Sequence, residues 1–327
     1  MKLTQSSTLK IATTDCKLHP KATAILTKAK NHCKLLGIYD EDRYLSHHTM
    51  TPYLFGYSSF DRTVDATIFF SVLYYLDDFF GEDSADSLKL DAQVLFRIWQ
   101  TGKYHIMNRY PPSKIDRLCA ALAYISGIIQ TKSPYSFFQH YTNYLRLHLQ
   151  HSLYPINYQT VEEYIQTRIH FGGMYPTIGM IEYVYDTYLT EELRDSLPLL
   201  VQLEESCALI GALSNDLFSY HKEAHSRFNL LNALMETHAN CNLEKAIKLA
   251  VDRVNGLYDN FLLNYSALKI QAESLPIAEQ QIITTYVDSL QQLIAASYHW
   301  QLNTNRYRAH DNVFEDMRIP LTYSILK

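Results

Sequence analysis

The chain has 327 residues and 47% of them are hydrophobic, which is enough to bury the core of one large domain. A formal net charge of -5, without a basic tail or stripe, argues against nucleic acid as a partner. The five cysteines form no CxxC pair, which is typical of reduced thiols in a cytoplasmic protein.

No linker or membrane span is indicated. Gly and Pro number only 10 each, and no Gly/Ser-rich or Pro-rich stretch divides the chain. We therefore expect a single domain over residues 1–327, with residues 1–20 as a flexible N-terminal segment. The longest apolar run, residues 66–76, is too short to cross a bilayer.

Helical periodicity dominates the sequence. Between residues 58 and 80 the apolar positions are spaced four, four and three apart, at Val64, Ile68, Val72 and Tyr75. Further helices are expected over 199–224, opened by a proline, and from 277 to about 308. No strand of useful length is found, so the sequence predicts an all-α helical bundle with short loops.

Four carboxylates lie at the end of the first of these helices: Asp77, Asp78, Glu82 and Asp83. The helix face that carries Asp77 also carries three large residues, Phe70, Leu73 and Tyr74. A carboxylate that ends an apolar face needs a partner, and Mg²⁺ prefers such oxygen ligands. A solvated helix end at a Gly81 turn would explain the same residues.

A second group of oxygen-bearing side chains ends the 199–224 helix, in the string NDLFSYHKE. Asn215, Ser219 and Glu223 are spaced four apart and share one face over roughly 12 Å. Amide, hydroxyl and carboxylate oxygens suit Mg²⁺, and Lys222 adds a cation that could meet a phosphate. Asp216 lies one position off that face and is expected to matter less. An ordinary polar helix end would explain any one of these residues, but not the whole string.

At these two strings the sequence resembles the class I terpene synthases of the compact microbial type. The first is similar to that family's DDxx(x)(D/E) motif and the second to its (N/D)Dxx(S/T)xx(K/R)(E/D) motif. Trp300 followed by Arg306 and Tyr307 also fits the family, as does Arg168 upstream of the second motif. The resemblance runs from about residue 60 to 310.

The resemblance implies a helical bundle with a central active-site cavity, in which three Mg²⁺ ions bind Asp77 on one side and the 215–223 motif on the other. It implies diphosphate contacts from four residues: Arg168, Lys222, Arg306 and Tyr307. Phe171 and Gly172 take the linker and effector positions, although a small polar residue or an acid is common where Phe171 stands. A pocket that stabilises carbocations would include Trp300, Tyr74, Leu73 and Phe70, with Trp300 and Tyr307 on one helix face.

The implied activity is that of a lyase that ionises an allylic C15 or C20 isoprenoid diphosphate and cyclises the carbocation to a terpene hydrocarbon or alcohol. Two alternatives stay open. A chain-elongating prenyl diphosphate synthase would carry a second aspartate-rich motif, where this chain has its Asn/Ser/Glu string. A non-catalytic helical scaffold would show no metal-dependent binding. The sequence leaves a homodimer open.

Overall fold

The computed structural model describes residues 8–14, 16–41, 44, 48–81, 92–105, 112–153 and 157–319, without the side chains of 77–81 and 153. These residues form helices and connecting segments, and no strand occurs among them, which confirms the predicted all-α fold. By its internal contacts the chain divides into two compact units. One unit comprises Lys17–Pro155 and Gly179–Leu189, and the other comprises Met1–Cys16, Ile156–Ile178 and Thr190–Lys327.

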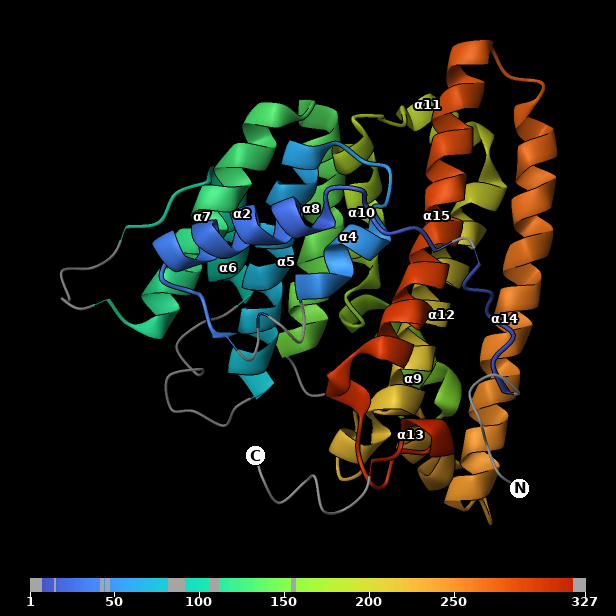
Figure 1. Ribbon diagram of the computed structural model, residues 1–327. Helices are drawn as coiled ribbons and strands as arrows, with labels where there is room; N and C mark the ends of the chain where they lie inside the picture. Colours follow the sequence, from blue (N-terminus) through green and yellow to red (C-terminus); the bar gives the residue numbers. More distant parts are fainter. Residues whose placement is uncertain are drawn as a thin grey trace. The chain divides into compact units, whose positions relative to one another are not determined.

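The first unit is organised around α5, which packs against α2, α7 and α8 (Figure 1). Its helices are α2 (Ala22–Leu35), η1 (His48–Met50), α4 (Thr51–Leu54), α5 (Phe60–Gly81), α6 (Ala92–Thr101), α7 (Lys114–Lys132), α8 (Tyr135–Leu153) and the end of α10 (Met174–Tyr185). Phe69 of α5 lies 5.2 Å from the ring of Trp99, which stacks on Phe138. The periodic positions that predicted α5 are buried, so this prediction is confirmed.

The second unit surrounds α12, which packs against α9, α13, α14 and α15 (Figure 1). Its helices are α9 (Val161–Phe171), the start of α10, α11 (Glu191–Ser196), α12 (Pro198–Glu223), α13 (Leu230–Thr237), α14 (Leu243–Ala272), α15 (Ile277–Asn303), η3 (Asn305–Tyr307) and η4 (Glu315–Met317). Pro198 occupies the first turn of α12, as its fixed φ favours. The predicted 199–224 helix is confirmed, and it carries the second motif at its C-terminal end.

The α15 helix ends earlier than predicted. The helix expected to reach about residue 308 ends at Asn303, because Thr304 adopts an extended backbone and its Oγ1 accepts the backbone N–H of Arg306. Arg306 and Tyr307 therefore lie in the 3-10 turn η3. The prediction that Trp300 and Tyr307 share one helix face is wrong, although their rings still meet edge to face at 5.7 Å.

Residues 8–12 of the predicted flexible N-terminal segment pack against α14. Leu9 and Ile11 are buried, and Lys10 forms an ion pair with Asp259 at 2.7 Å. The side chain of Asn255 donates to the carbonyl of Thr8. All five cysteines are free, as predicted. Among the described residues, none of the helices combines the length and the apolar character that a bilayer span requires.

Candidate active site

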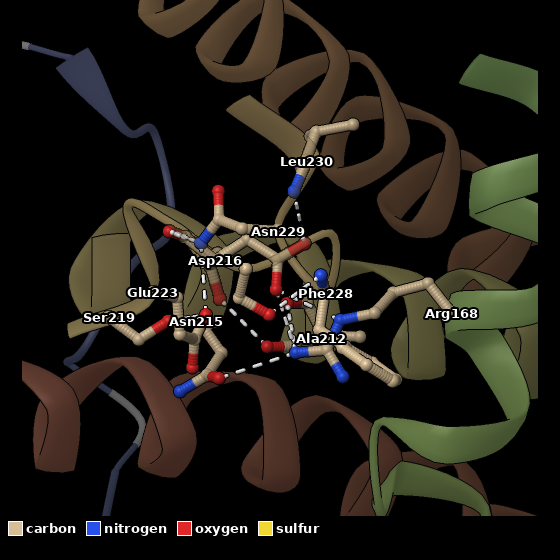
Figure 2. Close-up of polar contacts among 12 residues, drawn as sticks. Arg168, Ala212, Asn215, Asp216, Ser219, Glu223, Phe228, Asn229 and Leu230 are labelled. Carbon is tan, nitrogen blue, oxygen red and sulfur yellow. Dashed lines mark hydrogen bonds and ion pairs between the residues drawn. The ribbon is translucent and has the colours of Figure 1, made fainter. Parts of the chain in front are cut away.

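The last turns of α12 present the three oxygen-bearing side chains of the second motif (Figure 2). Ser219 donates its hydroxyl to Glu223 Oε2 at 2.8 Å, so these two side chains lie together on the helix surface. Asn215 is one turn earlier, and its Nδ2 donates to the hydroxyl of Tyr307 at 2.7 Å. This bond fixes the orientation of the amide and turns Oδ1 of Asn215 toward Arg168, which donates to it at 3.3 Å.

Asp216 is the anchor of this region, a role that the sequence did not indicate. Its carboxylate is fully buried and bonds residues of two other helices. Oδ1 accepts from Arg168 Nε at 2.9 Å and pairs with Arg168 Nη2 at 2.7 Å. Oδ2 accepts from the Tyr164 hydroxyl at 2.7 Å and from the backbone N–H of Leu230 at 3.0 Å. One side chain thus joins α9, α12 and the start of α13 (Figure 2).

The two charges of this buried pair influence each other's protonation. Burial raises the pKa of Asp216 to about 6, and the Arg168 guanidinium acts in the opposite direction. Burial alone would lower the pKa of Arg168, but Asp216 and Tyr164 hold it above its ordinary value. The guanidinium thus favours the ionised carboxylate, and the carboxylate favours the charged guanidinium.

The end of α9 lies close against α12. The Arg168 guanidinium carbon is 4.7 Å from the centroid of the Phe171 ring, and Phe171 meets Phe228 edge to face at 5.5 Å. A Cβ added to Gly172 would lie 2.8 Å from Cβ of Ala212 and 3.4 Å from Arg168 Nη1. This close approach explains why a glycine follows Phe171.

Tyr307, one of the residues predicted to bind diphosphate, lies beside the second motif. Its ring is buried, and burial raises the pKa of its hydroxyl. The exposed Lys222 places Nζ 5.7 Å from the centroid of the Tyr307 ring. Arg306 is half-buried beside Tyr307 in η3. Tyr307 and Arg168 thus both contact Asn215, while Lys222 and Trp300 lie against the ring of Tyr307.

The first acidic motif lies in the other unit. Asp77 and Asp78 belong to the last turns of α5, but their side chains are outside the description, and Glu82 and Asp83 lie outside the described residues. Phe70 and Leu73 are buried, whereas Tyr74 is half-buried. Phe70 stacks on Phe55 at 6.2 Å between ring centroids.

The donor set of the second motif fits a hard divalent cation. Asn215, Ser219 and Glu223 offer an amide, a hydroxyl and a carboxylate oxygen on consecutive turns. Within the described part of the chain, no group of three His, Cys, Asp or Glu side chains could hold a metal ion. That part of the chain therefore offers no cluster of the kind that zinc sites use.

Comparison with known proteins identifies the chain. The profile of a family described as terpene synthase family 2, C-terminal metal binding, matches residues 69–260, more than half of the sequence. The chain is a terpene synthase. The matched region of this terpene synthase includes Asp77 and the whole segment from Arg168 to Glu223, whereas Trp300, Arg306 and Tyr307 lie beyond it.

Curated relatives and solved structures agree. The terpene synthase is 24% identical over 251 residues to (+)-eremophilene synthase of Sorangium cellulosum, covering 74% of this chain and 73% of that protein. It is 28% identical over 155 residues to sesquiterpene synthase Agr3 of Cyclocybe aegerita, covering 47% of this chain and 42% of that one. The structure of hedycaryol synthase superposes with a TM-score of 0.76 at 15% identity, covering 92% and 98% of the two chains. The predicted family, its helical fold and its lyase class are confirmed, and neither alternative is favoured.

The sequence assigns Asp216, inside the motif, a lesser role and does not single out Asn229 beyond it. Asn229 is the N-cap of α13, and its Nδ2 donates to Glu223 Oε2 at 3.0 Å. An Asn directly before the apolar Leu230 and Leu231 is a recognisable helix start. That signal predicts the cap, but it does not indicate the contact with Glu223.

Proposed function

We propose that this terpene synthase uses Mg²⁺ held by Asn215, Ser219 and Glu223 to release diphosphate from an allylic isoprenoid diphosphate. The proposal rests on three hard oxygen donors that lie on consecutive turns of α12, beside the buried pair of Arg168 and Asp216. By resemblance, Asp77 is a further ligand and three ions bind. A single functional domain over residues 1–327 and a cytoplasmic location stay predictions. Whether the protein forms a homodimer stays open.

The side chains around α12 supply fixed positive charge and fixed donors. When bound, Mg²⁺ would stabilise the negative charge that builds up on the departing diphosphate. Arg168 keeps its charge while buried, because Asp216 holds its Nε and Nη2. Tyr307 holds the Asn215 amide so that Oδ1 points away from Tyr307. These groups need little rearrangement when charge develops, which is the condition for strong electrostatic stabilisation.

We assign Lys222, Arg306 and Tyr307 to diphosphate binding together with Arg168. Lys222 is exposed and its Nζ lies close to the Tyr307 ring, so its ammonium group can contact a diphosphate bound beside the end of α12. In the cyclisation that follows, Trp300 and the aromatic Tyr74 are the proposed stabilisers of passing positive charge, with Leu73 and Phe70 as apolar pocket walls. Each aromatic face would contribute about 0.5–2 kcal/mol.

We propose a C15 substrate, because one relative is itself a sesquiterpene synthase. The test gives purified protein C10, C15, C20 and C25 allylic diphosphates one at a time, with Mg²⁺ or with EDTA, and identifies extracted products by mass spectrometry. We expect a hydrocarbon or alcohol from the C15 substrate with Mg²⁺, no turnover in EDTA, and no longer chain when isopentenyl diphosphate is added.

Two variants make this test specific to α12. Ser219→Ala and Glu223→Gln should each lower kcat strongly and leave helix content unchanged. Ser266→Ala on α14, where the hydroxyl donates to the carbonyl of Leu262 one turn earlier, should leave turnover as it is. Undiminished turnover in EDTA would exclude the metal mechanism. Elongated diphosphates as the only products would exclude cyclisation.

A further inference from the structure

Asn229 bonds the metal motif from outside it. This side chain is fully buried, and its amide makes three hydrogen bonds. Nδ2 donates to Glu223 Oε2 at 3.0 Å and to the backbone carbonyl of Asp216 at 2.8 Å, while Oδ1 accepts from the N–H of Leu231 at 2.9 Å. Both donors and the acceptor of the amide are thus used within one small region.

The carboxylate of Glu223 depends on few other contacts. Glu223 is the last residue of α12, and a long side chain at a helix end has several rotamers of similar energy. From the described residues its carboxylate accepts two side-chain hydrogen bonds, from Ser219 and Asn229, and both fall on Oε2. Two donors on one oxygen hold Oε2 in place and restrict the rotamers that the carboxylate can adopt.

We propose that Asn229 is a positioning residue, which holds Glu223 in the orientation that binds the cation. Groups that hydrogen-bond a metal ligand set its direction, and their loss typically weakens metal binding by 10–100-fold. This inference rests on the proposed function, since it assigns Glu223 to the metal. The same amide caps α13, so the start of that helix and the metal ligand are held by one side chain.

Two substitutions separate positioning from capping. Asn229→Ser keeps an N-cap hydroxyl, because Ser caps about as well as Asn, but its side chain is too short to bond Glu223. Asn229→Asp keeps the size and the acceptor for Leu231, but it turns an oxygen toward the carboxylate of Glu223 where a donor stood. Asn242, the exposed N-cap of α14, bonds the N–H of Lys245 in the same way, so Asn242→Ser and Asn242→Asp are matched controls.

The measurement is the Mg²⁺ concentration that gives half of the thermal stabilisation produced by Mg²⁺ with inorganic diphosphate, confirmed by calorimetric titration. We expect Asn229→Ser to raise that concentration roughly tenfold, with saturation restored at high Mg²⁺, and Asn229→Asp to raise it further. The Asn242 variants should match the wild type. In turnover assays the same rise should occur in the Mg²⁺ requirement, with kcat recovered at saturating Mg²⁺ for Asn229→Ser.

The outcomes distinguish this inference from the proposed function. If the wild type shows no stabilisation by Mg²⁺ and diphosphate, the proposed function and the inference both fail. If the wild type binds and Glu223→Gln binds weakly while Asn229→Ser keeps the wild-type half-saturation, only the inference fails. If Asn229→Ser does not fold, Asn229→Asp decides alone, and an unchanged Mg²⁺ requirement in that variant overturns the positioning role.

Discussion

Replacement of Asp216 by Asn removes one charge from a buried ion pair and leaves the other in place. Asp216 is fully buried and the Arg168 side chain is 8% exposed, so water cannot replace the lost partner. Breaking such a pair on one side costs about 3–5 kcal/mol of unfolding free energy. The Asn side chain of this variant could still accept one or two of the four hydrogen bonds and ion-pair contacts that Asp216 makes. We therefore expect a loss near the lower end of that range, about 3 kcal/mol. Against a total stability of about 5–15 kcal/mol, that loss is large.

Urea denaturation at pH 7.5, followed by far-UV circular dichroism, measures this loss. Asp259→Asn is the control, because its ion pair with Lys10 is half-exposed and should contribute at most about 1 kcal/mol. Arg168→Met combined with Asp216→Asn removes both charges and should recover part of the stability that the single Asp216 variant loses. The reasoning is refuted if Asp216→Asn loses no more than Asp259→Asn, or if the two losses at positions 168 and 216 simply add.

Two further predictions concern aromatic and histidine side chains. Phe171→Leu should lower the free energy of unfolding by about 0.5–2 kcal/mol more than Phe228→Leu. Both variants lose the edge contact between the two rings, but Phe171 also faces the Arg168 guanidinium, so equal losses in thermal unfolding would contradict this prediction. Burial lowers the pKa of His48 to about 3, so its contribution to stability is complete above its ordinary pKa of 6.5 and is lost as the pH falls toward 3. Between pH 7.5 and 5.5 the wild type should therefore lose about 1.4 kcal/mol more than His48→Phe, which keeps a ring against Tyr44; parallel urea midpoints for the two proteins would exclude this effect.

The sequence predicted those features that depend on local periodicity. The spacing of apolar residues predicted α5, and the spacing of Asn215, Ser219 and Glu223 predicted their shared place at the end of α12. The end of α15 was predicted too late, because a short-range hydrogen bond of Thr304 competes with helix continuation and has no periodic signature.

The role of Asp216 could not be predicted, because its partners are remote in the chain. Its bonds to Tyr164 and Arg168 span 52 and 48 residues. Asn229 is closer, yet its bond to Glu223 depends on how the residues between them turn back on α12. Helix periodicity says which face a residue occupies, and it does not say which other helix meets that face.

Arg168 contacts two kinds of residue on α12: the proposed metal ligand Asn215 and the buried Asp216. Its Nη2 pairs with Asp216 and also donates to Oδ1 of Asn215, so one nitrogen is shared between anchor and proposed ligand. The planar fork of a guanidinium makes this sharing possible, whereas the single ammonium of Lys could not reproduce both directions. An anion that Arg168 contacts would therefore also act on its hydrogen bond to Asn215. If Arg168 binds diphosphate and Asn215 binds the cation, as proposed, the two binding events are coupled through one side chain, and a substitution at Arg168 should alter both affinities together.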